Sequence, residues 1–371
     1  MESVSGKPGF STAEGRWSAV GPYYAMFPID FAFRIVEKYC PKGGMVLDPF
    51  AGRGSSIYAA AAQNRNGVGI EINPVGWLYG NVKLRPGKQK LVTARIEELL
   101  KLSKAFAGVL PSPRLKRFFS LCYSKKVFSY LIAARSCLDW RNDRTDATLM
   151  AILLIYLHGK RGQSLSNQMR QGKAMSPEYS IQWWEEKKLL PPPDIDPVAF
   201  LKPRIEWRYE KGKPNFKESR MLLGDSTSVL RRMGQIQSSE KFNLLFTSPP
   251  YCDVTNYHYD QWLRLWMLGD EAEKILGKGT QWRGKFRSRE NYKELLTSIF
   301  GSCAELMKRG ARIYVRTDAR EFTFQTTMDA LKTAFPNKSA KTFLRPFSKP
   351  TQTALYGDKN EKPGEIDILM S

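Results

Sequence analysis

Short apolar runs alternate with longer amphipathic stretches near the start of the chain. Residues 31–39 and 55–63 carry apolar side chains at helical spacing, and the runs 45–47 and 67–70 that follow them have strand length. A hydrophobic period that changes from helix to strand and back predicts parallel strands joined by right-handed crossovers. This part of the chain therefore predicts an α/β fold.

The same alternation returns in the last third of the chain. The pattern predicts strands at 221–223, 242–246 and 311–316, helices at 227–233, 292–308 and 322–335, and two last strands at 352–355 and 365–370. We expect the two last strands to form an antiparallel pair at the edge of the sheet.

The segment between these two blocks has long helical stretches and clusters of basic residues. From residue 83 to 217 it holds 27 lysine and arginine residues against 12 aspartate and glutamate residues, so it carries +15 of the formal charge of +22. A single basic cluster is usually only solvated, but this concentration favours a surface that contacts phosphates. We therefore divide the chain into residues 1–83, a helical insert at 84–217, and residues 218–371.

Composition narrows the classes of protein further. The 371 residues include five scattered cysteines without metal-ligand spacing and only two histidines, His158 and His258. This predicts reduced thiols in a cytoplasmic protein and no metal site. The first ten residues lack the pattern of a secretory signal. The longest apolar run, 147–157, is too short to cross a bilayer and predicts a buried helix.

The first strand ends on a carboxylate and is followed by a glycine-containing turn. Asp48 ends the strand, Phe50 follows, and Gly52 and Gly54 let a ligand approach the backbone where open α/β sheets bind ligands. Glu71 ends the next strand, where an acidic side chain can hold a ribose diol. The third glycine of a dinucleotide pattern is missing. This argues against a pyrophosphate and for a nucleoside such as S-adenosylmethionine.

Three further residues have two interpretations each. Asp225 ends the strand at 221–223 and could accept a hydrogen bond from an adenine amino group or cap the helix that follows. Phe27 and Pro28 precede the first helix and could pack on the cofactor or belong to the core. We carry all three forward as candidate cofactor contacts.

The run Thr247-Ser248-Pro249-Pro250-Tyr251 follows the predicted strand at 242–246. Two prolines fix the backbone and supply no N–H donors, so their carbonyls point outward from a rigid turn. A nucleobase swung out of its stack could donate its amino group to the Pro249 carbonyl and to Ser248 Oγ. Tyr251 offers an aromatic face to that base. Ser248, Pro249, Pro250 and Tyr251 are the candidate catalytic residues.

Taken together, these motifs resemble the amino-DNA methyltransferases, which modify cytosine N4 or adenine N6. The resemblance covers residues 23–83 and 221 to the end. It implies a Rossmann-like, seven-stranded methyltransferase sheet, S-adenosylmethionine as methyl donor, and a flipped target base. It also implies that Asp48 lies near the methionine part, Glu71 at the ribose and Asp225 at the adenine.

Serine before the paired prolines is more similar to the cytosine-N4 enzymes, because the adenine enzymes more often carry Asp or Asn there. The cofactor loop, which contains Asp48, Gly52 and Gly54, precedes the catalytic loop at 247–251 in this chain. Most Ser-Pro-Pro-Tyr enzymes have the opposite order, and this leaves the subgroup open. In the helical insert, Ser166-Asn167-Gln168 and Trp183-Trp184 resemble segments of bacterial DNA methylases. We expect both segments to serve target recognition, and core packing is an equal interpretation of the tryptophan pair. The polar stretch 277–289 has the composition of a mobile loop that could become ordered on DNA.

Three alternatives to this prediction can be weighed from the sequence. Carbon-5 methylation of cytosine needs a cysteine that follows a proline in that family, and the chain has no Pro-Cys pair. An RNA base methyltransferase would use a similar loop, and a non-catalytic DNA-binding protein could retain the fold. We expect double-stranded DNA as substrate, a companion restriction endonuclease as partner, and no association with a membrane.

Overall fold

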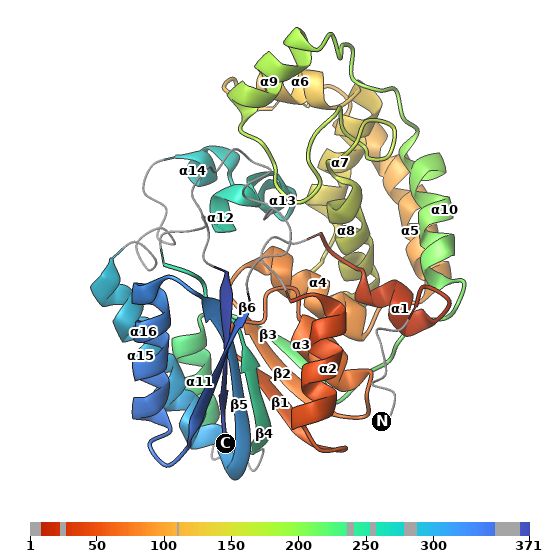
Figure 1. Cartoon of the computed structure of the whole chain (residues 1–371). Coiled ribbons are helices and arrows are strands. Elements are labelled where there is room, and N and C mark those ends of the chain that lie inside the picture. The colour runs from red at the N-terminus through yellow and green to blue at the C-terminus, as the bar shows by residue number, and fades with distance from the viewer. Residues whose placement is uncertain are drawn as a thin grey trace.

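A seven-stranded sheet lies at the centre of the computed structural model (Figure 1). The structure describes residues 9–22, 27–109, 111–235, 241–252, 257–277, 288–345 and 364–371, without the side chains of residues 257 and 258. The strands are β1 (Met45–Asp48), β2 (Asn66–Glu71), β3 (Arg220–Leu223), β4 (Phe242–Thr247), β5 (Met307–Asp318), β6 (Ala340–Arg345) and β7 (Glu365–Met370). Their order is β3-β2-β1-β4-β5-β7-β6. This confirms the predicted Rossmann-like sheet.

Six of the seven strands run in the same direction, and only β7, the last strand of the chain, runs in the opposite direction. The pairs β1–β2, β1–β4, β2–β3 and β4–β5 are parallel, while β7 is antiparallel to both β5 and β6. The predicted antiparallel edge is therefore confirmed, but its outer strand is Ala340–Arg345. The segment 352–355, which was predicted as this strand, lies outside the described residues. All six side chains of β6 are exposed, so no apolar pattern marked it in the sequence.

Helices cover both faces of the sheet. On one face lie α2 (Ile29–Tyr39) and α3 (Ser55–Ala61), and on the other α11 (Ser226–Gln235), α15 (Arg289–Leu306) and α16 (Glu321–Ala334). Neighbouring residues of one strand serve opposite faces: Val46 packs in the core with α2 and α3, and Leu47 in the core with α15. Because both faces are buried, these strands consist of continuous apolar runs.

The helical insert forms a second group of helices, which Figure 1 shows beyond the end of the sheet. It contains α5 (Gln89–Leu102), the 3₁₀ turn η1 (Ser103–Phe106), α6 (Lys116–Cys122), α7 (Lys125–Cys137), α8 (Arg144–Tyr156), α9 (Pro177–Glu186) and α10 (Pro197–Tyr209). The remaining helices are α1 (Ala13–Ser18), α4 (Pro74–Leu84), α12 (Tyr257–Asp260), α13 (Trp262–Met267) and α14 (Ala272–Leu276). Throughout the described ranges, no helix has the length and apolar character needed to cross a membrane.

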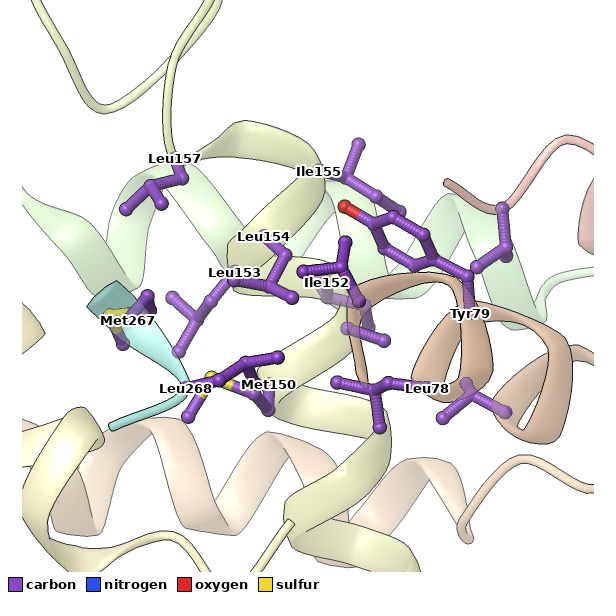
Figure 2. Close-up of a cluster of buried hydrophobic side chains, with 14 of the residues drawn as sticks. Leu78, Tyr79, Met150, Ile152, Leu153, Leu154, Ile155, Leu157, Met267 and Leu268 are labelled. Atoms are coloured by element: carbon purple, nitrogen blue, oxygen red, sulfur yellow. The ribbon is translucent and has the colours of Figure 1, made fainter. Parts of the chain in front are cut away.

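Helix α8 is the buried helix predicted for residues 147–157, and it joins the insert to the rest of the protein. Figure 2 shows it packed between α4 and α13. The cluster contains Leu78 and Tyr79 of α4, Met150, Ile152, Leu153, Leu154 and Ile155 of α8, Met267 of α13, and the adjacent Leu157 and Leu268. The same apolar core continues to α2 and α3. One continuous apolar core therefore joins the insert to the helices α2 and α3 that cover one face of the sheet.

The start of α4 presses directly on the turn that follows β1. A Cβ at Gly76 would lie 2.8 Å from the carbonyl oxygen of Gly52 and 3.1 Å from Cγ of Glu71. A backbone atom cannot yield as a flexible side chain can, so only glycine fits at this contact.

Replacing Gly76 with alanine should therefore lower the free energy of unfolding by about 1–3 kcal/mol, because the added methyl group overpacks a backbone contact. Gly301→Ala is the matched control, since a Cβ at Gly301 in α15 meets nothing within 4 Å. That variant should gain about 0.5–1 kcal/mol from helix propensity. Chemical denaturation measures both changes, and equal stabilisation of the two variants would contradict the close contact at Gly76.

Candidate functional site

Asp48 lies at the carboxyl end of β1 and its side chain is buried. Its Oδ1 accepts hydrogen bonds from the Phe50 N–H (3.1 Å) and from Thr247 Oγ1 (2.6 Å), and its Oδ2 accepts from the Ser56 hydroxyl. Burial raises the pKa of Asp48 to about 6, although these hydrogen bonds counteract part of the rise. One carboxylate thus connects α3, the end of β4 and the turn that follows β1, which we call the cofactor turn.

The turn after Asp48 depends on two glycines in left-handed backbone conformation. Gly52 has a φ of 52° and Gly54 a φ of 71°, which other residues rarely adopt. A Cβ at Gly54 would also lie 3.0 Å from Sδ of Met221 and 3.2 Å from Cα of Gly80. Both the backbone conformation and the lack of space for a Cβ require glycine at position 54. The turn therefore lies close to β3 and α4.

Glu71 ends β2 and reaches back to the same turn. Its Oε2 accepts from the Gly52 N–H (2.7 Å) and its Oε1 from the Asn73 N–H (2.8 Å). Burial raises the pKa of Glu71 to about 7, these two hydrogen bonds oppose the rise, and the nearby charge of Asp48 adds to it. Each carboxylate oxygen can accept more than one hydrogen bond. The residue therefore fits a ligand that presents two hydroxyl donors.

Asp225 lies in the turn between β3 and α11. Its Oδ1 accepts from the backbone N–H (2.9 Å) and the hydroxyl (2.6 Å) of Thr227. Asp225 therefore caps α11, which is one of the two interpretations of this residue. The same turn is tied to the cofactor loop, because Ser226 Oγ donates to the Pro49 carbonyl (2.5 Å) and Gly224 N–H to the Glu71 carbonyl (3.0 Å). The turn that contains Asp225 thus contacts Glu71 through the backbone, and the placement of Asp225 at the adenine stays a prediction.

Phe27 makes the contacts of the core-packing interpretation. Its ring stacks on that of Phe246 at a centroid distance of 4.5 Å and lies 5.5 Å from that of Phe31. Pro28 is exposed and precedes α2, where its carbonyl accepts the Ala32 N–H (3.0 Å). Phe246 lies in β4 just before the Ser-Pro-Pro-Tyr loop, so the Phe27 ring packs against the end of that strand.

The Ser-Pro-Pro-Tyr loop begins where β4 ends, directly beside the cofactor turn. Ser248, Pro250 and Tyr251 are half-buried and Pro249 is buried. The hydrogen bond between Thr247 and Asp48 connects this loop to the cofactor turn across adjacent strands. The strand order therefore brings the predicted cofactor and catalytic residues together at one edge of the sheet.

The contacts on the other side of this loop could not be predicted from the sequence pattern. The Tyr251 hydroxyl donates to Oε1 of Glu365 (3.0 Å), and Nη2 of Arg320 donates to the Cys252 carbonyl (2.7 Å). The hydrogen bond from Ser56 to Asp48 is likewise one that no motif marks. A motif with fixed spacing could not reveal partners that lie 114 and 68 residues away.

Within the insert, the side chains expected to recognise a target are used by the protein itself. Asn167 is fully buried, and its Nδ2 donates to the carbonyls of Leu121 (3.1 Å) and Leu189 (2.7 Å). Ser166 and Trp184 are also fully buried, and Trp184 Nε1 donates to the Gln168 carbonyl (2.6 Å). Trp184 thus follows its core-packing interpretation, and the side chains of Ser166 and Asn167 also hold the insert together in this conformation.

Residues 278–287 of the polar stretch and the side chain of His258 lie outside the described residues. The other histidine, His158, is fully buried, and its Nδ1 lies 2.7 Å from the Arg170 carbonyl. It is thus a structural residue of the insert.

Comparison with known proteins finds similarity to DNA methyltransferases. A family model described as DNA methylase, for the N6 and N4 methyltransferases, matches residues 2–75. The chain is 38% identical over 79 residues to the type II methyltransferase M.MthZI of Methanothermobacter thermautotrophicus, covering 21% of this chain and 19% of that protein. It is 22% identical over 277 residues to the type II methyltransferase M.BsoBI of Geobacillus stearothermophilus, covering 68% and 53%.

Similarity to solved structures is more distant. The rRNA methyltransferase aviRa from Streptomyces viridochromogenes aligns with 99% of this chain and 96% of its own, at 11% identity and a TM-score of 0.34. A similarity this low says nothing about the substrate. The chain spans about half the length of one curated relative and about a fifth of the other. The family match and the two curated relatives support the resemblance of this chain to the N6/N4 amino-group DNA methyltransferases.

Proposed function

We propose that this protein transfers a methyl group to the exocyclic N4 of cytosine in double-stranded DNA. The observation that carries the proposal is the 2.6 Å hydrogen bond between Thr247 and Asp48. It joins the Ser-Pro-Pro-Tyr loop to the cofactor turn at the carboxyl ends of adjacent strands. A methyl donor and an acceptor amine bound at these two loops would meet at one place, as a direct transfer requires.

S-adenosylmethionine is the cofactor of this family, and its sulfonium supplies an electrophilic methyl group. The residues present fit such a ligand. In this proposal Glu71 accepts the two ribose hydroxyls, and Gly52 and Gly54 let the backbone approach the nucleoside closely. Asp48 lies toward the methionine part and Asp225 toward the adenine, with Phe27, Pro28 and Phe50 around them.

On the acceptor side, the loop would hold the amino group of a base that has left the stack. The Pro249 carbonyl and Ser248 Oγ each accept one of its N–H groups, which directs the nitrogen lone pair away from them. Tyr251 stacks on the ring of the base, and Pro250 keeps the turn rigid. The amine would attack the methyl carbon as the bond from that carbon to sulfur breaks, S-adenosylhomocysteine would leave, and the methylated nitrogen would lose one proton to solvent. No covalent bond to the protein forms in such a transfer, so no cysteine is required.

The choice of cytosine over adenine rests on Ser248, since the adenine-N6 enzymes more often carry Asp or Asn at that position. The acceptor chemistry is the same for both bases. N6-methyladenine is therefore the first alternative product, ahead of a methylated RNA base or binding to DNA without catalysis.

We further propose that the helical insert, residues 84–217, is the target-recognition region between two parts of one catalytic domain, 1–83 and 218–371. Support comes from its excess of basic residues, since neutralisation of phosphates supplies much of the affinity for DNA. The curated relatives are named type II methyltransferases, which makes a companion restriction endonuclease the partner to look for.

Mass spectrometry of nucleosides tests the proposed product. DNA from a bacterial host that lacks N4-methylcytosine should acquire it when the protein is expressed there, and Tyr251→Ala should reduce its level at least about 100-fold by removing the ring that positions the base. Glu294→Ala, at an exposed position of α15, is the control that should leave the level unchanged. N6-methyladenine would overturn the choice of base, and absence of any Tyr251-dependent methylation of DNA would overturn the proposal.

The affinity for S-adenosylmethionine should depend on pH through Glu71. With a pKa of about 7, this carboxyl takes up a proton as the pH falls from 8.5 to 6.5, and it then loses capacity to accept ribose hydroxyls. If binding requires the ionised form, linkage predicts that Kd rises about fourfold as the pH falls from 8.5 to 6.5, because Kd scales as 1 + 10^(pKa − pH) with a pKa of about 7. Isothermal titration calorimetry at several pH values measures this, in a range that stays above the pKa of about 6 of Asp48.

Glu71→Gln should bind S-adenosylmethionine more weakly at pH 8, and its Kd should no longer depend on pH.

Protonation of Glu71 also changes the stability of the protein without ligand. Because folding raises the Glu71 pKa from 4.5 to about 7, its contribution to stability is complete below pH 4.5 and is lost as the pH rises through 7. A wild-type Kd that stays constant between pH 6.5 and 8.5 would contradict the assignment of Glu71 to the ribose.

A further inference from the structure

We propose that Glu365 is the positioning residue of Tyr251, and this inference rests on the proposed function of the Ser-Pro-Pro-Tyr loop. The Tyr251 hydroxyl donates to Oε1 of Glu365 over 3.0 Å. Glu365 is the first residue of β7 and lies opposite Asp318, at the carboxyl end of β5. It acts through the tyrosine and does not itself contact the base.

Arg316 forms an ion pair with Glu365, and Asp367 holds Arg316 in place. Its Oε2 lies 3.2 Å from Nη1 of Arg316. Arg316 in turn donates from Nε (2.7 Å) and Nη2 (3.0 Å) to the two oxygens of Asp367, whose side chain is completely buried. The guanidinium also lies over the Phe31 ring, 3.7 Å from its centroid. Two-point pairing and stacking fix the arginine, so the carboxylate that receives the tyrosine hydroxyl has one position.

The backbone around Tyr251 is fixed separately, which leaves the side chain as the adjustable part. Pro249 and Pro250 restrict φ on one side. On the other side, Arg320 Nη2 donates to the Cys252 carbonyl (2.7 Å), while its Nε donates to Oδ2 of Asp318 (2.6 Å). With the main chain held on both sides, the hydrogen bond to Glu365 selects the direction of the ring.

A ring that stacks on a base must present its face at one angle and one height. Without its partner the Tyr251 side chain can choose among several rotamers, and only some of them offer that face. A misplacement of about 1 Å at a reacting group can cost up to about 100-fold in rate. We therefore expect loss of the Glu365 contact to lower the rate of the methyl-transfer step and to leave binding of S-adenosylmethionine unchanged.

A double-mutant cycle tests the inference, with single-turnover methylation of plasmid DNA as the readout. Tyr251→Phe and Glu365→Ala should each lower the rate about tenfold. The double variant should be no slower than either single variant, since both changes remove the same hydrogen bond. Glu365→Gln should recover part of the rate because its amide oxygen still accepts. Additive losses, or a Glu365→Gln variant as slow as Glu365→Ala, would indicate a merely structural role and overturn the inference.

A second measurement does not depend on methylation. 3-Fluorotyrosine placed at position 251 should give one narrow ¹⁹F resonance, which should broaden or split in Glu365→Ala and remain unchanged in Glu294→Ala. An unchanged resonance in Glu365→Ala would overturn the positioning role. A resonance that depends on Glu365 in a protein that methylates no DNA would overturn the proposed function and support the contact between Glu365 and Tyr251.

Discussion

The site depends on one buried carboxylate, that of Asp48. Removing this group from water is unfavourable, and the structure compensates with hydrogen bonds from a backbone N–H and two hydroxyls. Those three donors belong to the cofactor turn, to α3 and to the end of β4. The same bonds that make the buried charge tolerable therefore fix the cofactor turn and the Ser-Pro-Pro-Tyr loop relative to each other.

Strand order explains why residues far apart in the chain meet at this carboxylate. The central strands lie in the order β3-β2-β1-β4, so the ends that carry Asp225, Glu71, Asp48 and Ser248 follow one another along the sheet. The helical insert separates β2 from β3 in the sequence but not in space, because Val68 pairs with Arg220 and Glu71 with Leu223. A long insertion is tolerated since it leaves and re-enters the sheet between adjacent strands.

Much of this architecture could be predicted from the sequence. Strands buried on both faces are continuous apolar runs, and Asp48 and Glu71 interrupt that pattern at the strand ends. The edge strand β6 could not be predicted in the same way, because all its side chains are exposed. Nor could local patterns indicate that Asn167 turns inward. Its partners, the carbonyls of Leu121 and Leu189, are set by how the helices of the insert pack.

The direction of β7 has a consequence for the catalytic loop. In a parallel strand, the residue at this edge of the sheet would be the last one, followed by a connecting turn. Because β7 runs antiparallel, its first residue, Glu365, lies at the carboxyl end of β5 and faces Tyr251 from within a regular strand. Residues on strands are held more precisely than residues on loops. The loop is thus fixed on its β4 side by Asp48 and on its β5–β7 side by Arg320 and Glu365, so its geometry needs the reversed strand as well as the cofactor turn.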